Sequence, residues 1–145
     1  MKEISAKLKS IISTSLPELR KMNDDITSVK KTHDQWSKKE ILGHLIDSCS
    51  NNHQRIVRAL HNVADQFPLY NQNEWVRVQK YNEMRWNDLL EFWAAYNNHL
   101  SIIIEKTPDS AGSAACNIGQ EELATLEFVV TDYIRHLQHH LGQIL

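Results

Sequence analysis

The chain has 145 residues, of which 41% are hydrophobic and 23% charged, and its net charge is −2. This length predicts a single domain over residues 1–145 with a sizeable core, and the near-neutral charge argues against a nucleic-acid partner, because such proteins usually carry a basic stripe. No apolar run approaches the ~20 residues that span a bilayer, the N-terminus lacks a signal-peptide pattern, and the two cysteines form no CxxC pair, so we expect a reduced, cytoplasmic protein with no membrane partner.

Helical spacing of apolar residues dominates the sequence, which contains only four Gly and three Pro. The spacing predicts a first helix from Lys2 to Met22. We expect Pro17 to kink or break this helix, because proline lacks the N–H that a helix uses. A polar loop over 23–35 follows. The basic pairs Lys30-Lys31 and Lys38-Lys39 are interpreted as solvated loop and helix ends.

The second helix has the clearest start signal in the chain. Ser37 and Glu40 have the spacing of a capping box, in which each side chain accepts a hydrogen bond from the backbone N–H of the other residue. Trp36 and Ile41 have the spacing of the matching hydrophobic staple. We expect this helix to run to about Val63.

The rest of the chain is predicted to form two more helices. An aromatic-rich connection over 63–81 leads into a third helix over 83–106, which ends before Pro108 because a proline disfavours helix in the residue before it. Small residues over 109–124 predict a loop with a short extended piece. Thr125 then caps a last helix that runs to the end of the chain. Four helices of this length predict an all-α fold, an antiparallel four-helix bundle.

The last helix carries two histidines one turn apart, His136 and His140. They lie roughly 40° apart at the edge of its apolar stripe, whereas His139 points toward solvent. Residues four apart on a helix are neighbours, so this pair can share one metal ion, although such a pair is more often two surface residues. The other five histidines are interpreted as surface or hydrogen-bonded residues. They are His33, His53, His61, His99 and His139.

The second helix carries a polar seam beside its apolar face. Its members recur at helical spacing and are His44, Ser48, Asn51 and Arg55. Placed against the last helix, this seam would enclose a polar pocket, and burying such groups without partners costs about 1–3 kcal/mol each. A metal ion, ordered water or a ligand is the natural partner. We therefore predict that His44 joins the histidine pair of the last helix around one divalent metal ion.

The sequence excludes several classes of metal site. Leucine follows His136 where the H-E-x-x-H pattern has glutamate, so a zincin-type protease is not expected. No histidine follows a glutamate at the spacing of ferritin-like centres, and Asp65 after His61 is weak support for a hemerythrin-like centre. What remains is a mononuclear site of three neutral imidazoles with open positions, suited to zinc, nickel, manganese or iron. Asp132, one turn before His136, is a candidate to orient a ligand.

Two stretches resemble the signatures of the DinB/YfiT-like superfamily. Residues 36–45, WSKKEILGHL, resemble its W-S-x-x-E-I/L-x-x-H-L/I signature, and residues 132–140, DYIRHLQHH, resemble its C-terminal H-x-x-x-H. The resemblance extends over about residues 10–145. It implies an up-down-down-up four-helix bundle, often dimeric, whose metal ligands are His44, His136 and His140.

Members of that superfamily with known activity are metal-dependent thiol S-transferases or related isomerases that use low-molecular-weight thiols. The resemblance therefore implies a metal ion that activates a small-molecule thiol, an electrophile as second substrate, and a homodimer. Asn51, Arg55 and Asp132 are candidates for catalytic or substrate contacts. The alternatives are a related hydrolase, a non-catalytic metal-binding or stress-related dimeric bundle, and a structural bundle with surface histidines.

Overall fold

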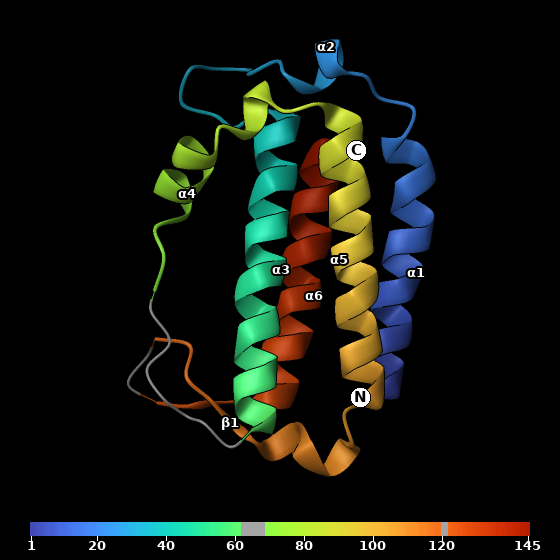
Figure 1. Cartoon of the computed structure of the whole chain (residues 1–145), viewed down its shortest axis with the longest axis vertical. Coiled ribbons are helices and arrows are strands. Elements are labelled where there is room, and N and C mark those ends of the chain that lie inside the picture. Colours follow the sequence, from blue (N-terminus) through green and yellow to red (C-terminus); the bar gives the residue numbers. More distant parts are fainter. Residues whose placement is uncertain (62–68, 120–121) are drawn as a thin grey trace.

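Four long helices, packed side by side, make up the body of the molecule (Figure 1). The structure is a computed structural model that describes residues 1–61, 69–119 and 122–145. The helices are α1 (Lys2–Leu19), α3 (Lys38–Leu60), α5 (Trp86–Lys106) and α6 (Leu126–Ile144). Figure 1 shows α1 and α6 running in one direction and α3 and α5 in the other. The predicted all-α, up-down-down-up four-helix bundle is thereby confirmed.

Shorter elements occupy the connections between the long helices. They are α2 (Asp24–Thr27), α4 (Gln72–Gln79), the 3-10 turns η1 (Tyr81–Glu83) and η2 (Asp109–Ser113), and the strands β1 (Ala115–Cys116) and β2 (Ala124–Thr125). The two strands pair antiparallel, so the extended piece predicted for this loop is present. Within the described ranges, no helix combines the length and the apolar character needed to cross a bilayer.

The long helices differ from their predicted bounds at three ends. Helix α1 continues through Pro17 and ends at Leu19, two residues later, so the helix is not broken at the proline. Helix α5 begins at Trp86 and not at Glu83, because Glu83 ends the separate 3-10 turn η1 and the backbone is extended at Met84 and Arg85. Helix α3 ends at Leu60, and its predicted end at Val63 lies outside the described residues.

Both predicted N-terminal caps are present. The Ser37 hydroxyl accepts the Glu40 N–H at 3.2 Å, and the Glu40 carboxylate accepts the Ser37 N–H at 2.8 Å. Thr125 caps α6 by accepting the Phe128 N–H at 3.2 Å. These caps set where α3 and α6 begin, and so fix how far along each helix its histidines lie.

A buried polar contact fixes the rotation of α6 within the bundle. Tyr133 is buried in the core, and its hydroxyl donates a hydrogen bond of 2.5 Å to Asn97 Oδ1 on α5. Asn97 in turn donates to the backbone oxygen of Trp93, so its own amide is satisfied. Because Tyr133 faces α5, His136 one turn later is held on the side of α6 that packs against α3.

Candidate metal centre

Three histidines from two helices meet at one end of the bundle. His44 comes from the second turn of α3, and His136 and His140 come from the last three turns of α6. Because α3 and α6 pack antiparallel, the start of one lies beside the end of the other (Figure 1). One nitrogen atom of each imidazole lies within 4.8 Å of the others.

The spacing of these nitrogens suits a shared ion. His44 Nε2 lies 3.2 Å from His136 Nε2. Two nitrogens bound to one tetrahedral zinc ion at about 2.0–2.1 Å would lie about 3.3 Å apart. Three converging imidazoles supply neutral nitrogen donors and leave further positions for a substrate, so the residues present fit a mononuclear divalent metal ion.

The second nitrogens of two imidazoles have orienting partners. His140 Nδ1 lies 2.8 Å from Gln143 Oε1, an acceptor that requires the proton on Nδ1 and leaves Nε2 as the nitrogen for an ion. His136 Nδ1 lies 3.4 Å from the Ser48 hydroxyl. Contacts of this kind fix the tautomer and ring plane of metal-binding histidines.

Burial keeps the imidazoles neutral. His44 is 1% exposed, and burial lowers the pKa of its imidazole to about 3, with repulsion from His136 and His140 adding to the effect. Burial likewise lowers the pKa of His136 to about 4, and it lowers the pKa of His140. The neutral form is the one that binds metal ions, so at neutral pH no proton has to leave these rings first.

We expect the metal-free protein to lose stability as the pH falls below 6.5. An unfolded histidine takes up a proton near pH 6.5, whereas folded His44 stays neutral until about pH 3. Between these values the unfolded state binds more protons, so acid favours unfolding. Urea unfolding at pH 7.5 and pH 5.0 measures the difference. The loss should be smaller in a His44→Gln variant, and an equal loss in both proteins would contradict this assignment.

Comparison with known proteins identifies the family of this bundle. The sequence profile of the DinB superfamily matches residues 10–144. The chain belongs to the DinB superfamily. Among solved structures, YfiT from Bacillus subtilis, described as a probable metal-dependent hydrolase with an unusual four-helix bundle topology, has a TM-score of 0.82 and 18% sequence identity, and the match covers 99% of this chain and 85% of YfiT.

A second similar structure is the mycothiol-dependent maleylpyruvate isomerase. Its TM-score is 0.78 at 13% identity, and the match covers 98% of this chain but only 59% of the isomerase. A comparison of the sequence with curated proteins gave no match. At these identities the two structures establish the shared fold.

Not all members of the predicted polar seam on α3 lie next to the three-histidine centre of this DinB-superfamily chain. Ser48 is there, next to His136. Asn51 is buried, and its amide donates to the backbone oxygen of Asp47 at 2.8 Å. Arg55 lies about 16 Å along the helix from His44, because each helical residue rises about 1.5 Å.

Asp132, the remaining candidate, belongs to the surface of α6. Its carboxylate forms an ion pair of 2.6 Å with Arg135, and the side chain is 42% exposed. It still acts on the centre through space, because its charge opposes the lowering of the pKa of His136. Its expected role as a residue that orients a bound ligand stays a prediction.

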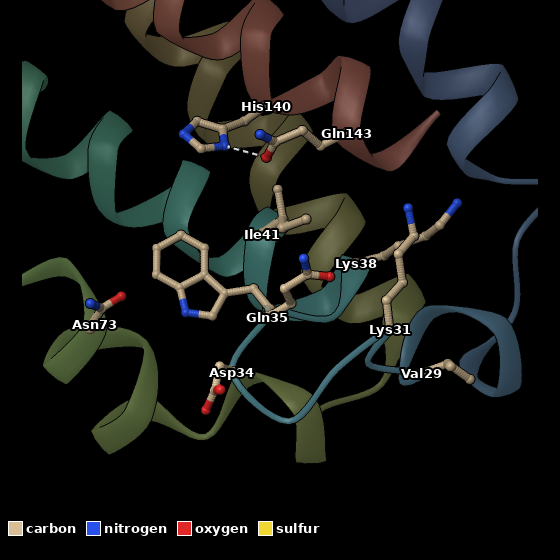
Figure 2. A pocket seen from close by; sticks show the side chains of 10 residues that line it. Val29, Lys31, Asp34, Gln35, Lys38, Ile41, Asn73, His140 and Gln143 are labelled. Carbon is tan, nitrogen blue, oxygen red and sulfur yellow. Dashed lines mark hydrogen bonds between the residues drawn. The ribbon is translucent and has the colours of Figure 1, made fainter.

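Sequence reasoning missed the residues of a cavity beside His140. The cavity has a volume of about 500 Å³, and α3, α4, α6 and the loop before α3 contribute to its wall (Figure 2). Trp36 lines it, and the indole lies 5.0 Å from the imidazole of His44 between ring centres. Four of the other nine lining residues lie in the loop before α3, where no periodic pattern marks which side chains face inward. The only signal was Trp36, which stands out as part of the cap of α3.

Proposed function

We propose that this protein is a metal-dependent enzyme that transfers a small thiol to an electrophile at the centre formed by His44, His136 and His140. The observation that carries the proposal is the position of three buried or half-buried neutral imidazoles next to a cavity of about 500 Å³. Such a volume lies in the range of small-molecule sites. A structural metal site would instead be closed by a fourth protein ligand.

The three histidines would hold one divalent ion, and zinc, nickel, manganese and iron all accept such a nitrogen-rich set. When bound, the ion supplies a Lewis acid that lowers the pKa of a thiol, so that the nucleophilic thiolate is present at neutral pH. The similarity to a mycothiol-dependent isomerase and to a probable metal-dependent hydrolase supports this class of chemistry.

The chain's own residues would bind and orient the substrates. Gln143 and Ser48 hold the rings of His140 and His136. Trp36 and Ile41 would give the cavity an apolar wall beside the centre, against which an apolar part of a substrate could pack.

Activity measurements on matched variants test the proposal. Metal-loaded protein would be assayed with bacillithiol, glutathione and cysteine against a small electrophile. We expect kcat/KM to fall at least about a hundredfold in a His136→Ala variant, because loss of one of three ligands removes the activating ion. A His99→Ala variant serves as control, since His99 is an exposed residue of α5.

Two results would contradict the proposal. The first is turnover that is unchanged in the His136→Ala variant. The second is an absence of turnover with every metal and thiol tried in protein that holds one equivalent of metal. The second result would favour a bundle that binds metal without catalysis.

A further inference from the structure

In each of the two basic pairs, Lys30-Lys31 and Lys38-Lys39, one lysine forms an ion pair and the other does not. Lys30 forms an ion pair of 2.8 Å with Glu40, and Lys39 forms one of 2.5 Å with Asp24. Lys39 is only 4% exposed, so the interpretation of this lysine as a solvated residue was wrong. One lysine of each pair therefore has its charge balanced by an acid and connects two segments of the fold.

The other lysine of each pair lines the cavity beside His140. Among the described residues, Lys31 has no hydrogen-bond or ion-pair partner. The Lys38 ammonium donates to the backbone oxygen of Ile144, a neutral acceptor at the end of α6. In Figure 2 both side chains extend to one side of the cavity, and the ring of His140 lies on another. Within residues 1–61, 69–119 and 122–145, neither of these ammonium groups forms an ion pair with a carboxylate.

The charges on the cavity wall leave a net positive side. Asp34 is the acid that lines the cavity, and its side chain is 97% exposed. The cavity wall thus carries two lysines and one solvated aspartate. This excess of positive charge favours the binding of an anion, although solvent weakens each single attraction.

We propose that Lys31 and Lys38 bind a carboxylate of the substrate, and that the cavity thereby selects small organic acids. The inference rests on the proposed function, in which the three-histidine centre would hold the reacting end of the same substrate. The carboxylate can belong to the thiol or to the electrophile, and the two arms of the test distinguish these sources.

The first arm is a series of short thiols that differ in charge: cysteamine is positive, 2-mercaptoethanol neutral and 3-mercaptopropionate negative. Binding to zinc-loaded protein is measured by calorimetry. In a Lys31→Gln variant we expect the Kd of 3-mercaptopropionate to rise about two- to fivefold and that of cysteamine to fall, because one exposed charge pair contributes little more. The three thiols differ in acidity as well as in charge. Because the acidity of a given thiol is the same for every variant, the ratio of its Kd values in two variants reports only the effect of the lysine.

Variants of neighbouring charges provide the controls. Lys30→Gln removes the same charge one residue away, from a lysine that pairs with Glu40, so the order of the three thiols should not change. Asp34→Asn removes the opposing charge from the wall and should tighten 3-mercaptopropionate. Lys38→Gln should repeat the effect of Lys31→Gln, but it also removes the bond to Ile144, so the exposed Lys31 is the decisive position.

The second arm uses glutarate, an acid without a thiol, and metal-free protein. The indole N–H signal of Trp36 in an NMR titration reports occupancy of the cavity. Saturable binding that is weakened in Lys31→Gln, without a charge preference among the thiols, assigns the carboxylate to the electrophile. This arm remains valid if the protein binds no metal, so failure of the metal centre and failure of the carboxylate site are separate results. Affinities that Lys31→Gln leaves unchanged in both arms, or that Lys30→Gln changes equally, overturn the proposal.

Discussion

Replacing His44 with alanine is expected to abolish stoichiometric metal binding. His44 is the sole ligand that α3 offers to the three-histidine group among the described residues, and its Nε2 lies 3.2 Å from that of His136. Two histidines on one helix bind an ion much more weakly than three preorganised ones, so the affinity should fall at least about a hundredfold. Protein purified without a histidine tag and analysed by mass spectrometry of its metals should show about one equivalent in the wild type and no stoichiometric metal in His44→Ala.

Thermal unfolding gives an independent readout of the same change. A ligand that binds only the folded state adds about 2.7 kcal/mol when its concentration is 100 times its Kd. Added zinc should therefore raise the Tm of the wild type and leave that of His44→Ala unchanged.

His139→Ala is the matched control for both measurements. Its imidazole neighbours that of His140, with 5.0 Å between ring centres, but it is exposed and lies outside the three-histidine group. This variant should keep its metal. Equal metal content in His44→Ala and wild type, or equal loss in His139→Ala, would show that the ion binds elsewhere.

Features that depend on local pattern were readable from the sequence. The capping box of Ser37 and Glu40 lies within one turn, and the apolar periodicity of the long helices gave the bundle. Helix α2 was missed because it is only four residues long and depends in part on distant contacts: Asp24 pairs with Lys39 and accepts the backbone N–H of Trp86. A propensity pattern over four residues contains neither partner.

The candidate site shows the same division. A helical wheel correctly placed His44 and Ser48 on the side of α3 that meets α6. The same wheel placed Arg55 on that flank but ignored the rise along the axis, which carries it about 16 Å away from His44. Lys31 is exposed, as interpreted, but its place on the cavity wall was not predicted, because tertiary contacts set the path of its loop. The residues that line the cavity therefore became visible only in the three-dimensional structure.

Replacing Gly43 with alanine is expected to destabilise the protein by about 2–4 kcal/mol, from overpacking and a damaged buried hydrogen bond. A Cβ atom at Gly43 would lie 2.1 Å from Cδ2 and 2.2 Å from Cγ of Tyr81, which is a severe clash with the ring. The ring must move, yet its hydroxyl donates a bond of 2.7 Å to Asp47, which is buried. Gln79 donates to the same carboxylate oxygen at 2.8 Å, so two hydrogen bonds hold segment 79–81 against α3 close to His44.

Urea unfolding of three proteins isolates this steric cause. Gly142→Ala is the matched control, because a Cβ there meets no atom within 4 Å and alanine is the better helix former by about 1 kcal/mol. It should leave stability unchanged or raise it. In a Tyr81→Ala background, Gly43→Ala should lose most of its cost, since the clashing ring is gone. A cost at Gly43 no larger than at Gly142 would contradict the packing. Because Gly43 directly precedes His44, the wild-type glycine lets segment 79–81 pack against the same turn of α3 that supplies the histidine.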